Sequence, residues 1–353
     1  MFSFGFTEED LDPEGPQQST KSISSAVQCP LDSPHLLEAV QPQWEDFRSI
    51  LQSLVGVRIS FETFGTPQGH VLYRRELFDI KHQLMTESDG SESVELDILI
   101  GDTAEDLRKN IYEGGLKSWE CSIDLVDYLA RDNALLQASS CVVELGCGTA
   151  LPSEYALSQY LLGGSHQGLK LVLGDYNKSV LRLVTLPNLI LIWSQVTLNG
   201  DQRRQLQTGY ENAPLEDEEL FLTPRLLDEF HNEMEKRKIE ISFISGTWGR
   251  QFNQLLLKYL QPIKEILVLS SETIYQPENL PVVAETLFEL FKAQDYQSIK
   301  ALVAAKDIYF GVGGSIVDFE NYMAKVIKDK KLPLSFTTSK INAGLKRSIV
   351  LIE

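Results

Sequence analysis

The 353-residue chain is poor in cysteine, in basic residues and in long apolar runs. Its four cysteines form no C-x-x-C pair, and none lies near a histidine at the spacing of zinc ligands, so we expect no metal site. So few cysteines in a chain of this length indicate a reducing compartment without structural disulfides. No apolar run approaches the ~18 residues of a membrane-spanning helix. The start, MFSFGFTEEDLD, lacks the basic residues of a secretory signal, and we therefore expect no membrane association.

Positive charge is also scarce, because 32 lysines and arginines stand against 50 acids and give a net charge of −18. Such a surface repels phosphates, so we expect no direct binding to nucleic acid. The charge favours a basic partner, such as a ribosomal protein or a histone. The same excess of acids can also serve solubility alone. Charge by itself thus supports a basic partner without identifying one.

Composition divides the chain into three parts. Residues 1–47 hold nine acids, five prolines and a single lysine, which predicts an acidic flexible tail. Residues 48–102 contain short runs rich in Val, Ile, Leu and aromatics, including 70–84, which predicts an antiparallel β-rich extension. Residues 103–353 form the third part, in which helical and strand-like segments alternate from about residue 120.

This alternation predicts an α/β fold for the third part. Five strand–helix units follow one another, and two strand-like segments, 332–341 and 347–353, close the chain without a helix between them. The order predicts a doubly wound, Rossmann-like sheet of seven strands, mainly parallel, with an antiparallel C-terminal hairpin. Ligands of such sheets bind at the carboxyl ends of the strands, where the strand order reverses.

A glycine-rich turn, VVELGCGTALPS, follows the first predicted strand of this sheet. Gly146 and Gly148 lack the third glycine or alanine of a dinucleotide fingerprint, and the turn lacks the lysine of a P-loop. The pattern E-x-G-x-G, with Asp175 at the end of the second strand, suits S-adenosyl-L-methionine, which has a ribose and a cationic amino-acid part but no pyrophosphate. We expect Gly146 to admit the cofactor, Glu144 to attract its ammonium and Asp175 to accept its ribose hydroxyls.

Longer motifs resemble a known family. The stretches YEGGLKSWECSIDLVDYL, VELGCGTALPS and SSETIYQPENL are similar to eukaryotic seven-strand protein methyltransferases, and GGLKSWEC, SSETIY and YFGVGGS together most resemble the protein-histidine methyltransferases. The resemblance covers roughly residues 95–353. It implies methylation of a histidine ring nitrogen in a basic protein, a large-subunit ribosomal protein, with S-adenosylmethionine as the methyl donor. We further expect a monomer in the cytoplasm and nucleus.

The resemblance also implies roles for individual residues around the cofactor. Two of them have simpler explanations that stay open, because Trp119 can be a core residue and Asn188 can cap a helix break at Pro187. The implied cofactor-binding residues are Lys117, Ser118, Trp119, Glu120 and Cys121 at the pocket mouth, Gly146 at the methionine end, Asp175, Tyr176 and Asn177 at the ribose and adenine, Asn188 near the cofactor, Gly246 and Trp248 beside the adenine, and Ser270 and Ser271 beside the sulfonium.

The segment after the fourth strand suggests the acceptor. Lysine-methylating relatives carry D-x-x-Y there, whereas this chain has Glu272 and Tyr275 at the two ends of the motif. A lysine, with a pKa of ~10.4, must lose a proton before it attacks, but an imidazole, with a pKa of ~6.5, is mostly neutral at pH 7. We expect Glu272 to accept one ring N–H and to disperse the developing charge, with Tyr275 lining the channel. The simpler alternative is that Glu272 is only an acid near a helix start.

Two other functions stay open from the sequence. One is a protein-lysine methyltransferase of the same fold, which product analysis would distinguish. The other is a non-catalytic binding or chaperone-like module that holds a basic ribosomal protein without methylating it. The intact E-x-G-x-G pattern and Asp175 favour an enzyme, because a scaffold has no need of a cofactor pocket.

Overall fold

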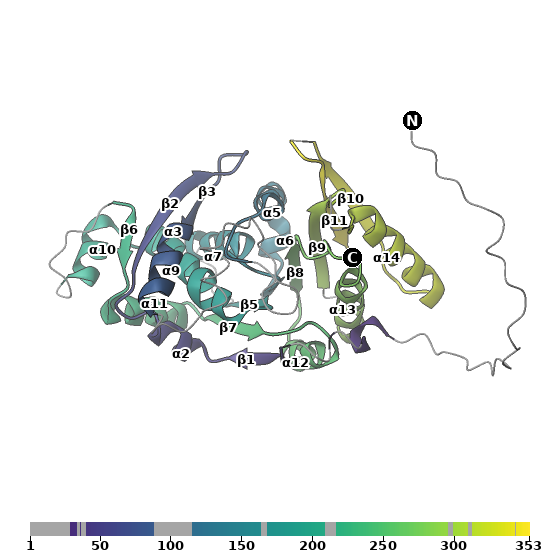
Figure 1. The fold of residues 1–353 in the computed structure, drawn as a ribbon, viewed down its shortest axis with the longest axis horizontal. Coiled ribbons are helices and arrows are strands. Elements are labelled where there is room, and N and C mark those ends of the chain that lie inside the picture. The colour runs from purple at the N-terminus through teal and green to yellow at the C-terminus, as the bar shows by residue number, and fades with distance from the viewer. Residues whose placement is uncertain are drawn as a thin grey trace, which may run out of the picture.

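The centre of the protein is one mixed sheet with helices on both faces (Figure 1). This is a computed structural model, in which residues 29–33, 36, 40–87, 115–163, 168–208, 217–295, 299–309, 313–342 and 344–353 are described. Among these residues, the central sheet has eight strands in the spatial order β1 (Gln43–Glu45), β7 (Ile239–Ser245), β5 (Leu169–Asp175), β4 (Cys141–Leu145), β8 (Ile266–Ser271), β9 (Ile299–Lys306), β11 (Arg347–Ile352) and β10 (Phe336–Ile341).

The direction of the strands confirms the predicted doubly wound α/β sheet. Strands β7, β5, β4, β8 and β9 are parallel, and β11 is inserted antiparallel between β9 and β10. Strand β1 adds an eighth strand at the edge, antiparallel to β7. The chain runs outward from β4 to β7 and then returns to β8 on the other side of β4, so the strand order reverses between β4 and β8. Ligands of such sheets bind at this reversal.

The helices bury both faces of the sheet. Successive strand residues point to opposite faces, so Val142 belongs to one core cluster and Val143 to the other. All residues of β4 are buried, as a parallel strand covered on both sides requires. The first face packs against α5 (Glu120–Arg131), α7 (Leu151–Gly163), α9 (Leu186–Thr197) and α11 (Pro224–Lys236), and the second against α12 (Arg250–Leu260), α13 (Leu280–Ala293) and α14 (Ile316–Lys330).

Shorter helices complete the description. Helix α6 directly follows α5, and α10 begins at a capping box in which the Asn199 side chain accepts from the Gln202 backbone N–H. The shorter elements are η1 (Pro30–Asp32), α2 (Phe47–Gln52), α3 (Leu77–Glu87), α6 (Asn133–Gln137), α8 (Lys178–Val180), η2 (Leu181–Thr185) and α10 (Gly200–Gln207).

The predicted β-rich extension contains a hairpin and helices. Strands β2 (Arg58–Gly65) and β3 (Val71–Arg75) are antiparallel, and β6 (Glu219–Phe221) pairs with the other edge of β2. The expectation of a strand through residues 70–84 is wrong after Arg75, because β3 ends there and helix α3 begins at Leu77. Ile80 and Leu84 are buried four residues apart, which is a helical spacing. The part of the predicted β-rich extension after residue 87 lies outside the described residues.

Part of the predicted acidic tail belongs to the fold. Strand β1 extends the sheet, and its Glu45 accepts a hydrogen bond from Ser245 Oγ at 2.6 Å and pairs with Lys178 at 2.7 Å. In η1, Leu31 is buried and Asp32 forms an ion pair with Arg250 at 2.8 Å. The prediction that the flexible tail extends to residue 47 is therefore wrong for η1 and β1, because these segments supply buried contacts and a strand. Residues 1–28 lie outside the described part of the chain.

One continuous helical segment, Lys178–Thr197, is long and apolar enough to cross a membrane by length and composition. However, 78% of its most apolar window is buried inside the protein. Core helices of globular domains share this composition. The segment packs against α7 and β3 and serves as a core helix.

Candidate active site

A cavity of about 510 Å³ opens at the carboxyl ends of the parallel strands. Its walls come from the segments that follow β4, β5, β7, β8 and β9, so it lies beside the reversal of strand order. Its volume lies in the usual range for small-ligand sites. Ten predicted site residues line it, namely Lys117, Trp119, Gly146, Gly148, Asp175, Tyr176, Trp248, Ser271, Glu272 and Tyr275.

The glycine turn after β4 forms one end of the cavity. Gly146 has a φ of 69°, and its N–H donates to the Gly174 carbonyl at 2.8 Å. A Cβ on Gly146 would lie 2.6 Å from Thr273 Cγ2, which is closer than real Cβ atoms approach. Both the left-handed backbone and this close approach require glycine. The turn therefore keeps its backbone open toward the cavity.

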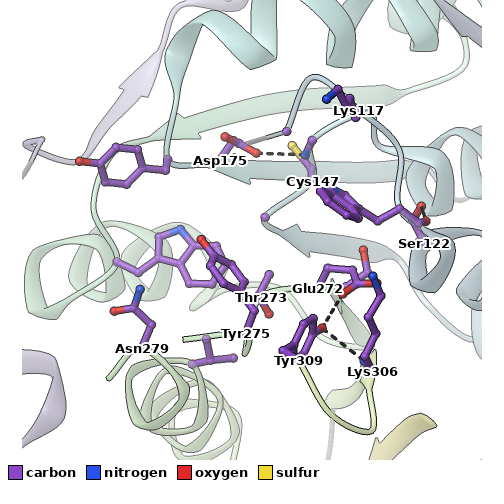
Figure 2. Close-up of a pocket in the computed structure, with 18 of the residues that line it drawn as sticks. Lys117, Ser122, Cys147, Asp175, Glu272, Thr273, Tyr275, Asn279, Lys306 and Tyr309 are labelled. Carbon is purple, nitrogen blue, oxygen red and sulfur yellow. Dashed lines mark hydrogen bonds and ion pairs between the residues drawn. The ribbon is translucent and has the colours of Figure 1, made fainter. Parts of the chain in front are cut away.

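Asp175, at the end of β5, is held against the glycine turn. Its carboxylate accepts from the Gly148 N–H at 3.0 Å (Figure 2). It also accepts from the Asn177 N–H at 3.0 Å. Burial raises the pKa of Asp175 to about 6, although these hydrogen bonds oppose the shift. The carboxylate is therefore charged at pH 7, and it faces the cavity as predicted for a ribose acceptor.

This pKa predicts that cofactor binding depends on pH. A ribose hydroxyl would donate to the charged form of Asp175, and this form is lost as the pH falls through about 6. We expect the affinity for S-adenosylhomocysteine to be about tenfold weaker at pH 5 than at pH 7. Calorimetry across this range measures the effect, and Asp175→Asn should abolish it. A wild-type affinity that does not change with pH would contradict the role of Asp175.

The glycine turn is also fixed from behind by the helical segment that contains Pro187. The segment passes through a π-helical turn, η2, directly before α9. Proline donates no N–H and clashes with the preceding turn, which is a common cause of such a distortion. Thr185 Oγ1 donates to the Gly148 carbonyl at 2.6 Å, and Asn188 Nδ2 donates to the Thr149 carbonyl at 2.8 Å. The distorted segment thus supports the turn backbone.

Asn188 therefore acts on the turn and does not line the cavity. It is fully buried, and its Oδ1 accepts from the Arg75 backbone N–H at 2.9 Å. The expectation that Asn188 approaches the cofactor is wrong, because its side chain lies behind Thr149. It does more than cap the helix break, because it joins the glycine turn to strand β3.

Glu144 faces the core and not the cavity. It is 1% exposed, and its Oε2 accepts from the Ser153 N–H at 3.1 Å and from the Ser153 hydroxyl. Burial raises its pKa to about 8. The predicted attraction of a ligand ammonium is therefore wrong for this residue. Its side chain shares the sheet face of Val142, two residues away, which packs against the helices.

Other predicted residues also lie beside the cavity instead of on its wall. Ser118 hydrogen-bonds to Thr149 Oγ1 at 2.9 Å, and Ser270 donates to the Leu145 carbonyl at 3.1 Å. Both support segments that do line the cavity. The sequence-predicted cofactor residues outside the wall are Ser118, Glu120, Cys121, Glu144, Asn177, Asn188, Gly246 and Ser270.

Gly246 has a structural role at the sheet edge. A Cβ there would lie 2.6 Å from Pro42 Cα, so the residue allows the segment before β1 to approach β7. Cys121 is fully buried, and Glu120 directs its carboxylate to Lys306 at 3.4 Å. Trp119, by contrast, is 40% exposed on the cavity wall, which excludes the core role that the sequence left open.

The opposite end of the cavity holds Glu272, directly after β8. Figure 2 shows Glu272, Tyr309 and Lys306 close together and apart from Asp175. The Tyr309 hydroxyl accepts from the Lys306 backbone N–H at 3.3 Å and donates to Glu272 Oε2 at 2.5 Å. Burial and the neighbouring carboxylate raise the pKa of Tyr309 well above its usual value, so the hydroxyl keeps its proton. Tyr309 therefore fixes one oxygen of Glu272.

The other oxygen of Glu272, Oε1, is buried and has no hydrogen-bond partner of normal geometry among the described residues. The Lys306 ammonium lies 3.9 Å from it. The Cys121 thiol also lies against this carboxylate, and burial together with the carboxylate raises the pKa of Cys121. The backbone of Glu272 is also constrained, since its φ is 57° and its N–H donates to the Ala304 carbonyl at 2.9 Å. A non-glycine residue held in this conformation is a frequent feature of functional sites.

Several polar residues of the cavity wall have no role predicted from the sequence. Lys306 ends β9, Tyr309 follows β9 and Thr273 follows β8, so a polar residue at or after the end of a buried strand was the available signal. Tyr309 begins the YFGVGGS motif, which supports the family resemblance but has no chemical role predicted from the sequence. The unassigned polar residues on the wall are Ser122, Thr149, Thr247, Thr273, Asn279, Lys306 and Tyr309.

Tyr309→Phe tests the support of Glu272. The variant keeps the ring but loses the hydrogen bond to the carboxylate, so methyl transfer should slow about tenfold while cofactor affinity stays the same. Tyr322→Phe is the matched control, because its hydroxyl donates to Glu285 at 3.0 Å outside the cavity. Single-turnover rates of both variants provide the measurement. Equal rates for the two variants would show that Tyr309 does not position Glu272.

No protein-family model matches the chain, but individual relatives do. Histidine protein methyltransferase 1 from Saccharomyces cerevisiae is 50% identical over 370 aligned positions, which span 100% of this chain and 98% of the relative. Histidine protein methyltransferase 1 from Schizosaccharomyces pombe is 33% identical, over 100% of this chain and 93% of the relative.

A solved structure, "Human methyltransferase 10 domain containing protein", is more distant. Its TM-score is 0.35 at 9% identity, over 64% of this chain and 80% of that chain. The assignment rests on the two yeast relatives, whose similarity extends over the whole chain, including the glycine turn and the Glu272 segment. They confirm the resemblance seen in the motifs. The chain belongs to the histidine protein methyltransferase family.

Proposed function

We propose that the protein is an S-adenosylmethionine-dependent enzyme that methylates a ring nitrogen of a histidine in a large-subunit ribosomal protein. The observation that carries this proposal is the cavity, which has Asp175 and the glycine turn at one end and Glu272 at the other. Family membership supports the reaction. The net charge of −18 supports a basic substrate.

The cavity wall fits the cofactor. Within the described part of the chain, Thr247 Oγ1 and Trp248 Nε1 are buried without a hydrogen-bond partner, and both residues line the cavity. Buried polar atoms are costly unless a ligand or water satisfies them. These two residues would border the adenine, Asp175 would accept from the ribose, and Gly146 would leave room for the methionine part. When bound, S-adenosylmethionine supplies a methyl group on a positively charged sulfur.

We propose that Glu272 holds the histidine. Tyr309 occupies Oε2, whereas Oε1 has only the ion pair with Lys306, so Oε1 can accept the N–H of one ring nitrogen, which leaves the lone pair on the other nitrogen. The ring gains positive charge as its free nitrogen forms the new bond, and the carboxylate stabilises that charge. Glu272 can then take the N–H proton, which returns the methylated ring to neutrality.

Mass spectrometry of an in vitro reaction tests the function. The protein is incubated with isotope-labelled S-adenosylmethionine and proteins extracted from large ribosomal subunits. We expect label on a histidine of one basic protein. Label on lysine alone would support the lysine methyltransferase alternative. Stable binding of a ribosomal protein without any label would support the non-catalytic alternative.

The remaining expectations belong to the same proposal. We propose a monomer that acts in the cytoplasm and nucleus, without direct contact to nucleic acid or membrane. The acidic balance of the chain supports the absence of nucleic-acid contacts. Light scattering tests the oligomeric state, and microscopy of the tagged protein tests the location. A stable dimer in solution or exclusive membrane staining would contradict these expectations.

A further inference from the structure

Lys306 lies inside a cluster that has the composition of an ammonium-binding site. Its Nζ is 3.4 Å from Glu120 Oε2, 3.9 Å from Glu272 Oε1 and 5.0 Å from the centre of the Trp119 ring. The Lys306 side chain is only 15% exposed, and it lines the cavity together with Trp119 and Glu272. Figure 2 shows the end of its side chain beside Glu272. The lysine of the protein itself therefore occupies the acceptor end of the cavity.

Carboxylates and the faces of aromatic rings are groups that recognise a cation, and this cluster contains two carboxylates and a tryptophan. The carboxylates attract an ammonium by charge, and the ring attracts it through its quadrupole. A substrate lysine would need these same groups, because it is charged at pH 7. In this protein Lys306 already neutralises them in part. A second ammonium would have to lie beside the first and would be repelled.

We infer that Lys306 is a specificity-determining residue that fills the ammonium site and thereby excludes a cationic lysine acceptor in favour of neutral imidazole. The inference rests on the proposed function, in which Glu272 holds the acceptor. Glu120 and Glu272 carry two negative charges against the one positive charge of Lys306, and the neighbouring Arg347 is already paired with Asp124. The remaining negative charge lets Glu272 stabilise the ring as it becomes positive. Removing Lys306 leaves both carboxylates to attract a cation.

A second lysine in the protein provides a matched control. Lys330 lies 3.2 Å from Glu285 and 6.0 Å from the centre of the Phe288 ring, so it also joins a carboxylate and an aromatic ring. Its side chain is 55% exposed, and it does not line the cavity. Removing Lys330 therefore removes a positive charge, a comparable ion pair and a comparable ring contact, but it leaves the acceptor end of the cavity intact.

Small probes of the two acceptors test the inference in the complex with S-adenosylhomocysteine. Butylammonium represents the lysine side chain and imidazole the histidine side chain, and at pH 8 only butylammonium is charged. Lys306→Met keeps most of the apolar stem over Trp119 while it removes the charge. By ligand-observed NMR titration we expect Lys306→Met to bind butylammonium at least tenfold more tightly than the wild type, with imidazole binding changed less than threefold. Lys330→Met should match the wild type.

Lys306→Arg and the wild type complete the test. Arginine retains the charge, so Lys306→Arg should still exclude butylammonium. Wild-type protein that binds butylammonium as tightly as imidazole would overturn the inference without any variant. Equal butylammonium affinities for wild type and Lys306→Met would also overturn it. These measurements involve no methyl transfer, so they are distinct from the labelling experiment, in which a lack of methylhistidine would refute the proposed function.

Discussion

Gly146→Arg is expected to raise the dissociation constant for S-adenosylhomocysteine by more than about 100-fold. The first atom of the new side chain would lie 2.6 Å from Thr273 Cγ2 and 3.4 Å from Trp248 Cη2, so the side chain must extend into the cavity or displace its wall. Either outcome removes space that the cofactor needs. Calorimetric titration of the purified variant measures the change.

The variant also introduces backbone strain, which requires a control. Gly69 has a φ of +86°, and an added Cβ there meets nothing within 4 Å. Gly69→Arg therefore carries the strain of a left-handed residue without filling the cavity. We expect it to bind S-adenosylhomocysteine as the wild type does. If both arginine variants lose the ligand equally, the effect comes from destabilisation and not from the site.

The glycine turn could be predicted because its chemistry is local. Gly146, Gly148 and the acid at the end of the next strand lie within 30 residues, and the strand–turn–helix order places them at one edge of the sheet. Parallel strands align their carboxyl ends, so Asp175 meets the turn wherever β4 and β5 are neighbours. Pattern and topology together were sufficient for this end of the cavity.

Glu144 shows where reading a motif alone fails. The acid belongs to a recognisable pattern, but its direction is set by the two-residue period of the strand. Val142 on the same face packs against helices, and Glu144 consequently meets Ser153 at the start of α7. Because helices cover both faces of the sheet, a side chain within β4 faces a helix, whereas the cavity lies beyond the end of the strand.

Other contacts could not be inferred because they join distant parts of the chain. Asn188 accepts a hydrogen bond from Arg75, 113 residues away, and Glu45 accepts one from Ser245, 200 residues away. No local pattern indicates that an acidic, proline-rich segment will supply an edge strand. The N-terminal contribution to the fold therefore required the structure.

Glu272→Gln is expected to lower kcat by roughly 10²–10³ while leaving cofactor affinity nearly unchanged, judged by the loss of comparable transition-state contacts. The amide oxygen can still accept either the ring N–H or the Tyr309 hydroxyl, but the NH2 group at the other position can accept neither. The amide lacks the negative charge that stabilises the ring as the methyl group arrives. Single-turnover rates on the histidine substrate, with S-adenosylhomocysteine titrations alongside, measure the two effects separately.

Glu285→Gln distinguishes this role from a structural one. Glu285 is buried, accepts from Tyr322 at 3.0 Å and pairs with Lys330 at 3.2 Å, so it has the same kinds of partner as Glu272 but lies outside the cavity. Its substitution can lower stability, yet the rate of the folded protein should stay within about twofold of the wild type. A slow Glu285→Gln variant would point to damage to the fold. A Glu272→Gln variant with the wild-type rate, or with no cofactor affinity, would show that the carboxylate does not act on the acceptor.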